Sequence, residues 1–224
     1  MKIYIINSGL SNVSSVANMV KWVGFTPIVT QSIKEVNEED KIIFPGIGNF
    51  SQAMSNLKDL DIIDDIKKSV LVRKNDFLGI CLGAQMLAKN LGGSVQKSHD
   101  LTLEIGFFDI NPTGDGHKMF QSQKKFFQWH REGFTVPQSC EILAKGDLFR
   151  EQAFRYKNAL AIQFHPEVNL KMHLRWLYYA GYMLKEKGAQ NRREQLTHRL
   201  KHGKKINLWL DSFLDNYLLK DINS

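Results

Sequence analysis

Cys81 stands in a setting that is typical of a reactive nucleophile. An apolar run over residues 77–80 leads into it, Gly79 and Gly83 flank it, and a stretch of helical character follows. This pattern predicts a nucleophile elbow, a strained turn between a strand and a helix in which the next backbone N–H points toward a developing oxyanion. A cysteine there attacks as a thiolate. The alternative is a small buried hydrophobic residue, the usual state of a free cysteine.

A base and a group that orients it occur far along the chain. The apolar segment 159–164 predicts a buried strand and leads into His165, Pro166 and Glu167. An imidazole produces a thiolate by taking its proton, and it needs one ring nitrogen fixed by an acceptor. Glu167 is close enough in sequence to be that acceptor. Cys81, His165 and Glu167 are therefore the candidate catalytic residues.

A glycine turn supplies a third motif. The expected strand 42–44 ends in Pro45, Gly46, Ile47 and Gly48. Most Pro-Gly pairs are simply turns. Beside an elbow, however, such a turn can direct a backbone N–H at the oxygen of a tetrahedral intermediate, which makes Gly46 and Ile47 candidates for the second half of an oxyanion hole.

These motifs, in this order, resemble those of the class I (triad) glutamine amidotransferase family. The resemblance covers about residues 2–167. The amino-terminal half, with Asn7, Ser8 and Gly9, is similar to the glutaminase subunit of imidazole glycerol phosphate synthase. The half around Gln128, Trp129 and His130, together with Gln163, is similar to the glutaminase of GMP synthase. The expected relatives are therefore enzymes that release ammonia from glutamine.

The resemblance implies a role for each matched residue. Cys81 would attack the side-chain amide of L-glutamine, and His165 would protonate the departing ammonia and then activate water. Glu167 would orient His165. Gln85 would contact the substrate, and the backbone N–H of Leu82 would contact the oxyanion.

The segment 126–134 contains a second histidine of interest. The resemblance implies that the turn around Trp129 and His130 holds the glutamine substrate. His130 is equally well explained as a structural histidine beside a core tryptophan. It also has Glu132 two residues later, so the residues alone leave open that His130 is the base, and the resemblance favours His165.

The composition fits a compact enzyme. A chain of 224 residues with 43% hydrophobic content can bury one large core, so we expect a single domain over residues 1–224. Cys81 and Cys140 are too few for a disulfide framework and lack metal-ligand spacing, so we expect no metal and no cofactor, with Cys140 packing at a strand edge. No stretch resembles a signal peptide or reaches the length of a membrane span, so we expect the cytoplasm and no membrane partner.

Alternating strand and helix patterns predict a doubly wound α/β fold. Strands are expected at residues 3–6, 27–30, 41–44 and 76–80. Helices are expected at residues 11–23, in parts of 54–73, and at 82–91. Short β segments follow at residues 104–110, 125–129 and 152–156. The prediction is thus a mostly parallel central sheet with flanking helices, a small β-rich section and a closing C-terminal helix.

The part after residue 167 combines helical patterns with a basic stretch. Leu174, Leu177, Tyr178 and Gly181 fit a helix, and an apolar stripe over residues 208–218 predicts the closing helix. Between them, the basic stretch 185–205 contributes much of the net charge of +7 through Lys185, Lys187, Arg192, Arg193, Arg199, Lys201, Lys204 and Lys205. Most such runs are solvated helix faces. A docking surface for an acidic partner is the alternative, and nucleic-acid binding is disfavoured because no aromatic residues are interleaved.

Three functions remain open. The leading one is hydrolysis of the glutamine side-chain amide through a cysteinyl thioester, with ammonia supplied to an acceptor-activating or synthase subunit on another chain, since no phosphate-binding glycine loop is present. The second is a γ-glutamyl hydrolase or peptidase with the same triad. The third is a non-catalytic module, which the intact Cys81, His165 and Glu167 disfavour.

Overall fold

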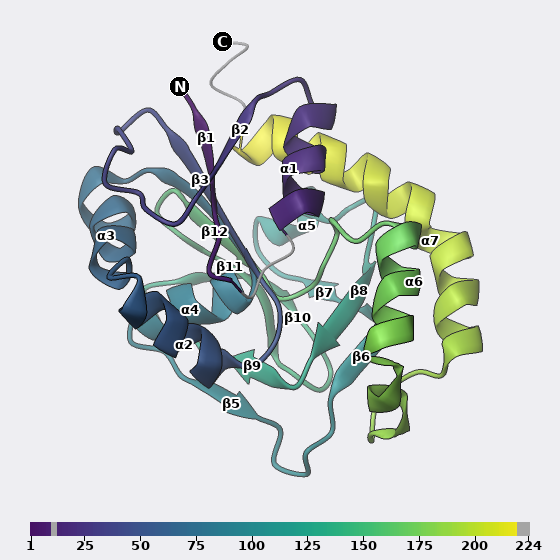
Figure 1. The fold of residues 1–224 in the computed structure, drawn as a ribbon. Helices are drawn as coiled ribbons and strands as arrows, with labels where there is room; N and C mark the ends of the chain where they lie inside the picture. Colours follow the sequence, from purple (N-terminus) through teal and green to yellow (C-terminus); the bar gives the residue numbers. More distant parts are fainter. Residues whose placement is uncertain (10–12, 219–224) are drawn as a thin grey trace.

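An eight-stranded sheet runs through the middle of the computed structural model, which describes residues 1–9 and 13–218 (Figure 1). Its strands are β1 (Ile3–Ile6), β2 (Pro27–Thr30), β3 (Lys41–Gly46), β4 (Asp76–Cys81), β7 (Asn111–Pro112), β10 (Glu141–Lys145), β11 (Glu151–Tyr156) and β12 (Ala159–Ile162). Their order is β2-β1-β3-β4-β12-β11-β10-β7. The strands from β2 to β12 in this order are parallel, and β11, β10 and β7 continue the sheet in antiparallel pairing. The predicted α/β fold with a mostly parallel sheet is confirmed.

Alternate residues of the central strands face opposite layers of helices. On one face Ile3 and Ile5 share a core with residues of α1 (Val13–Trp22), α5 (Gly116–Met119) and α7 (Arg192–Phe213). On the other face Tyr4 and Ile6 pack with residues of α2 (Phe50–Asp59), α3 (Ile63–Lys68) and α4 (Leu82–Asn90). The two layers are visible in Figure 1, with α6 (Leu170–Tyr179) beside α7. Strands buried on both faces explain the continuous apolar runs in the sequence.

The β-rich section forms two small sheets next to the main one. Strand β6 (Glu104–Asp109) pairs with β8 (Lys125–His130), and β5 (Val95–Lys97) pairs with β9 (Glu132–Phe134), each in antiparallel register. The predicted β segments 104–110 and 125–129 correspond to β6 and β8. The turn between β8 and β9 places His130 and Glu132 at the junction of the two sheets.

Side-chain caps fix the starts of the helices that follow the site motifs. Asn49 caps α2 and Asn169 caps α6, each by accepting a hydrogen bond from a backbone N–H of the first turn. Helix α7 begins with a capping box between Asn191 and Glu194. Because Asn49 follows the glycine turn and Asn169 follows the histidine motif closely, both site loops run directly into anchored helix starts.

Helix α7 differs from the expected arrangement. The basic stretch does not connect two separate helices: from Arg192 onward it belongs to the same helix as the apolar stripe. Trp209, Leu210 and Phe213 of the stripe are buried, but Leu208 is 60% exposed because it lies on the opposite face of the helix. The burial of Trp209 is completed by a hydrogen bond of 2.8 Å from its Nε1 to the carbonyl oxygen of Met119.

Two predictions lie partly outside the described residues. The first helix was expected to include Ser11 and Asn12, and the described helix α1 begins at Val13. The side chains of Tyr217 and Leu218, expected in the apolar stripe, are likewise not among those described.

No described helix has the length and apolar character needed to cross a membrane. The described residues also contain no group of three or more His, Cys, Asp and Glu side chains placed to hold a metal ion.

Candidate active site

Cys81 ends β4 in the strained geometry that the elbow pattern predicts. Its backbone has φ 51° and ψ −102°, and α4 begins at the next residue, Leu82. Positive φ is uncommon for a residue with a Cβ and persists where the surroundings impose it. The surroundings here are close: a Cβ at Gly83 would lie 1.9 Å from the carbonyl oxygen of Phe44, and one at Gly79 would lie 2.8 Å from the backbone of Gly83. The glycines therefore allow β3, β4 and α4 to meet behind Cys81.

The glycine turn leaves the sheet directly beside the elbow. Strand β3 pairs with β4 in a register that places Gly46 opposite Cys81. A Cβ at Gly46 would lie 2.5 Å from the Cβ of Leu82, and Gly48 has φ +106°. The turn thus needs glycine both for the close approach and for its left-handed conformation. This arrangement brings the backbone of Gly46 and Ile47 and the first turn of α4 to the same side of Cys81.

His165 and Glu167 follow the strand next to β4. Strand β12 pairs with β4 in parallel, with Ile162 opposite Ile80, so its carboxyl end reaches the elbow. His165 Nδ1 lies 2.8 Å from Glu167 Oε1. The other ring nitrogen, Nε2, is buried and has no hydrogen-bond partner among the described residues. A ring with one nitrogen held by a carboxylate and the other free is arranged to exchange a proton with a neighbouring thiol.

The charges around His165 favour its protonated form. Burial lowers the pKa of the imidazole, but the negative charges of Cys81 and Glu167 outweigh burial and raise the pKa above its ordinary value. Cys81 and His165 are 4% and 1% exposed, respectively. In such a poorly solvated place a thiolate and an imidazolium stabilise each other strongly.

An open cleft of about 760 Å³ lies beside the site. Of the predicted site residues, Ile47, Trp129 and His130 line it. The others are buried and are not among its lining residues: Gly46, Cys81, Leu82, Gln85, His165 and Glu167. The remaining lining residues combine backbone, cations and aromatic rings: Gly9, Gly48, Asn49, Lys97, Arg131, Glu132, Arg175, Trp176, Tyr179, Ala180, Tyr182 and Met183. The cleft is large enough for a small amino acid and opens to solvent.

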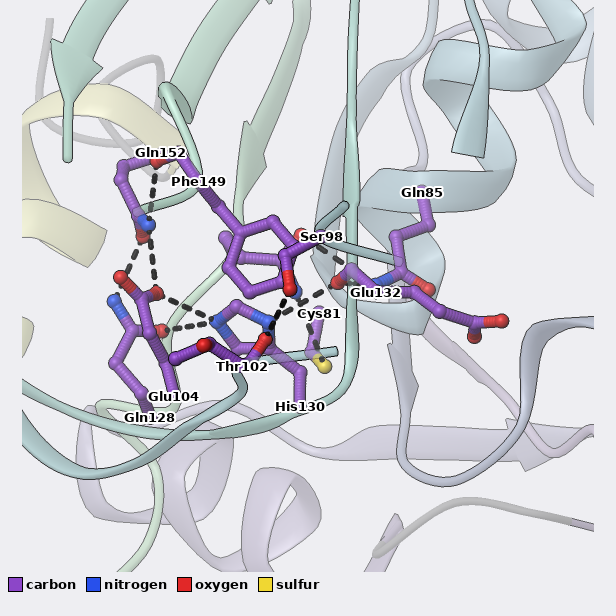
Figure 2. Close-up of polar contacts among 11 residues, drawn as sticks. Cys81, Gln85, Ser98, Thr102, Glu104, Gln128, His130, Glu132, Phe149 and Gln152 are labelled. Carbon is purple, nitrogen blue, oxygen red and sulfur yellow. Dashed lines mark hydrogen bonds and ion pairs between the residues drawn. The ribbon is translucent and has the colours of Figure 1, made fainter. Parts of the chain in front are cut away.

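His130 belongs to a buried polar network and is not arranged as a base. Figure 2 shows its Nδ1 beside the carbonyl oxygen of Glu132, at 3.0 Å, and its Nε2 between Gln128 Oε1 and Glu104 Oε2, both at 3.1 Å. Each ring nitrogen therefore faces oxygen atoms that can accept a hydrogen bond. Gln152 joins the network by donating to Glu104 Oε2 at 3.0 Å.

The carboxylate of Glu132 does not orient His130, which corrects that alternative. Glu132 Oε2 instead accepts a hydrogen bond of 3.1 Å from the backbone N–H of Phe50, at the start of α2. The contact with His130 is made by the backbone carbonyl of Glu132.

A chain of side-chain amides connects this network with Cys81. Gln85 Nε2 donates to the carbonyl oxygen of Glu132 at 2.7 Å and lies 3.5 Å from Gln163 Oε1. Gln163 Nε2 in turn lies 3.6 Å from Cys81 Sγ. From the sequence, Gln163 was indicated only by the resemblance to the GMP synthase glutaminase, without a role in the site, and Glu104 was not indicated at all. One sequence feature indicated that Gln128 lies near His130: it is two residues earlier, and side chains two apart on a strand share a face.

Comparisons with known proteins identify the family of this chain. The family model "Glutamine amidotransferase class-I" matches residues 4–180. The imidazole glycerol phosphate synthase subunit HisH 1 of Campylobacter jejuni is 39% identical over 78% of this chain and 96% of its own length. HisH 2 of Methanococcus maripaludis is 31% identical over 77% of this chain and 95% of its own. The chain therefore belongs to the class-I glutamine amidotransferase family.

Solved structures show the same fold. A glutamine amidotransferase from Thermotoga maritima matches with a TM-score of 0.79 and 23% identity, covering 100% of this chain and 99% of that one. A glutamine amidotransferase from Methylobacillus flagellatus matches with a TM-score of 0.75 and 18% identity, covering 98% of this chain and 94% of that one. The family expected from the sequence motifs is confirmed.

Proposed function

We propose that this protein is the glutaminase subunit of a two-chain synthase, with Cys81, His165 and Glu167 as its catalytic residues. The observation that carries the proposal is the convergence of three loops: a strained cysteine at the end of β4, a His165–Glu167 pair held at 2.8 Å after β12, and a glycine turn after β3. The HisH relatives are named as subunits of imidazole glycerol phosphate synthase, which supports a separate synthase subunit as the partner. With both of its cysteines unpaired, the protein suits the reducing cytoplasm.

The proposed reaction proceeds in two halves. The Cys81 thiolate attacks the side-chain carbonyl carbon of glutamine, and the resulting oxyanion accepts hydrogen bonds from backbone N–H groups of Leu82 and the Gly46–Ile47 turn. The protonated His165 gives its proton to the amide nitrogen, the C–N bond breaks, and ammonia leaves a thioester on Cys81. His165 then takes a proton from water, which attacks the thioester and releases glutamate. The sum is glutamine plus water giving glutamate plus ammonia.

Substrate binding is assigned to the cleft beside Cys81. Ile47, Trp129 and His130 line it, and Arg131 and Arg175 provide positive charge at its wall. A guanidinium suits the carboxylate of an amino acid substrate. We propose that the Gln85–Glu132 and His130–Glu104 contacts hold this wall in place while the glutamine side chain reaches Cys81.

The test is release of ammonia from L-glutamine by the purified protein. We expect Cys81→Ala to lower the rate by about 10⁴-fold or more, as in other coupled triads, and to keep the fold. Cys140→Ala is the matched control: Cys140 is buried ahead of β10, and burial raises the pKa of its thiol, so it should retain wild-type activity. Ammonia release clearly above background at equal rates in wild type and Cys81→Ala would overturn the proposal.

Two further experiments apply if the wild-type protein is slow without its partner. An electrophilic glutamine analogue should label Cys81 and not Cys140, and L-glutamine should protect against labelling. γ-Glutamyl dipeptides are offered as competing substrates, because a γ-glutamyl peptidase attacks the same carbonyl with a different leaving group. Faster release of an amino acid from the dipeptides than of ammonia from glutamine would assign the site to that second activity.

A further inference from the structure

Trp176 of α6 lies between the cleft and the catalytic histidine. It is one of the residues that line the cleft. Its ring also packs at right angles against the imidazole of His165, with ring centroids 5.2 Å apart and planes at 89°. His165 itself does not line the cleft and is only 1% exposed. One side of Trp176 therefore borders the open cleft, and another covers His165.

Strand β8 fixes both the indole of Trp176 and the backbone of His165. Trp176 contacts Trp129 at a centroid distance of 5.6 Å and Phe127 at 5.8 Å. Aromatic pairs at such distances attract each other. The carbonyl oxygen of Phe127 also accepts a hydrogen bond of 2.8 Å from the backbone N–H of His165. The narrow space between the indole and the imidazole is thus set by a common neighbour.

The space next to His165 decides which leaving group the site can accept. In the proposed reaction His165 gives its proton to the nitrogen of the breaking C–N bond, so this nitrogen must come within about 2.6–3.2 Å of the imidazole. The leaving nitrogen of glutamine carries only hydrogen atoms. The leaving nitrogen of a γ-glutamyl dipeptide also carries the Cα and the carboxylate of an amino acid, which need room beside His165.

The charge of the cleft does not exclude such a dipeptide. Lys97, Arg131 and Arg175 line the cleft, against the single carboxylate of Glu132. That carboxylate accepts a hydrogen bond from the backbone N–H of Phe50. The additional carboxylate of a dipeptide would therefore meet a positive wall, and any discrimination against it must be steric.

We propose that Trp176 is a specificity-determining residue: it closes the space next to His165, so the site accepts the primary amide of glutamine and excludes γ-glutamyl peptides. The proposal rests on the proposed function and names the substrate class of the same site. The glutamyl part reaches Cys81 along the glycine turn, where Ile47 and Gly48 line the cleft and Gly46 lies opposite Cys81. The leaving group lies on the other side, under the ring of Trp176.

A smaller residue at position 176 should admit the dipeptide to the same chemistry. The Cys81 thiolate attacks the γ-carbonyl carbon, and His165 protonates the peptide nitrogen. The C–N bond breaks, and the amino acid leaves with a free amine. Water then releases glutamate from the thioester and returns a proton to His165, so γ-glutamylglycine plus water gives glutamate plus glycine.

The experiment compares kcat/KM for ammonia release from L-glutamine with kcat/KM for glycine release from γ-glutamylglycine. The variants are Trp176→Ala, Trp176→Leu and Trp176→Phe, of which the second keeps an apolar contact and the third a smaller ring. Tyr178→Ala is the matched control, because Tyr178 is on the same helix and is 78% exposed. Protection of Cys81 against iodoacetamide by each compound is measured at one fixed pH by mass spectrometry of the Cys81 peptide, which needs no turnover.

We expect the ratio of the dipeptide to the glutamine value to rise about 10-fold or more in Trp176→Ala and Trp176→Leu, since a single methylene group in a pocket already changes such ratios by about 10- to 200-fold. The rise should be smaller in Trp176→Phe and absent in Tyr178→Ala. The protection ratio should change in the same direction, and it decides if turnover is too slow to measure.

An unchanged ratio in a folded Trp176→Ala or Trp176→Leu variant would overturn the proposal even if both rates fall, because a purely structural role lowers the two reactions together. If neither of these variants folds, Trp176→Phe decides by the same comparison. A wild-type protein that hydrolyses the dipeptide as fast as glutamine would also refute the proposal. Absence of both ammonia release and protection by glutamine in wild type would instead refute the proposed function itself.

Discussion

Replacing Glu104 with alanine should destabilise the protein by about 2–4 kcal/mol, because two buried donors lose an acceptor. The carboxylate of Glu104 is 3% exposed, and its Oε2 accepts from His130 Nε2 at 3.1 Å and Gln152 Nε2 at 3.0 Å. Alanine leaves both donors buried without that acceptor. Each lost hydrogen bond costs about 1–2 kcal/mol, since Gln128 Oε1 still lies beside His130 Nε2 and the carbonyl oxygen of Phe149 still accepts from Gln152.

Two comparison variants separate the effect of the Glu104 charge from the effects of its side-chain volume and its buried location. Glu104→Gln keeps the shape and an acceptor for Gln152 but loses the charge toward His130, so we expect a smaller loss of about 1–2 kcal/mol. Asp109→Ala breaks an ion pair on the same strand, with Lys125 at 2.7 Å, but the Asp109 side chain is 62% exposed. Exposed pairs contribute at most about 1 kcal/mol.

The free energy of unfolding is measured by urea denaturation at pH 7, followed by circular dichroism and tryptophan fluorescence. A loss for Glu104→Ala within about 1 kcal/mol of the loss for Asp109→Ala would refute the reasoning, because burial would then make no difference. Since His130 lines the cleft, Glu104→Gln should also raise the KM for glutamine while leaving the iodoacetamide reactivity of Cys81 unchanged.

Three other changes have defined outcomes. Glu167→Gln keeps a hydrogen bond to His165 but not the charge, so ammonia release should fall by about 10- to 100-fold, less than for loss of the nucleophile; a wild-type rate would make Glu167 a bystander. Gly83→Ala places a methyl group 1.9 Å from a backbone oxygen and should abolish folding, whereas Gly181→Ala, with open space around it, should not change the melting temperature. His173 has a folded pKa of about 4 against an ordinary 6.5. Acidification from pH 6.5 to 4 should therefore cost wild type about 3 kcal/mol that His173→Leu does not lose, and parallel pH–stability curves would contradict this.

The local parts of the site could be predicted from the sequence. The residues next to Cys81, two glycines and an apolar run, indicate its local geometry, and the buried strand before His165 does the same for the histidine. Parallel strands place such residues at one edge of a sheet. The fold class followed from the same alternation of strand and helix patterns. Cys81 and His165 were therefore expected together although they are far apart in the chain.

The supporting residues could not be predicted in the same way. Glu104 and His130 meet because β6 and β8 pair in one particular register, which no local pattern specifies. Arg199 belongs to a run of cations, and the composition of that run predicts a solvated helix face. Only the packing of α7 against β6 and β8 shows that Arg199 is buried. Leu208 shows the reverse case, since an apolar residue within an apolar run faces solvent.

The contacts of Glu132 have a mechanical consequence for the cleft. Its carboxylate holds the backbone N–H of Phe50 at the start of α2, and its carbonyl oxygen holds Gln85 of α4 and His130 of β8. One residue therefore connects the two walls of the cleft with the helix that follows the nucleophile. Neither wall can be displaced far from the other without breaking one of these hydrogen bonds, so a protein that pulls on the start of α2 also pulls on the helix behind Cys81.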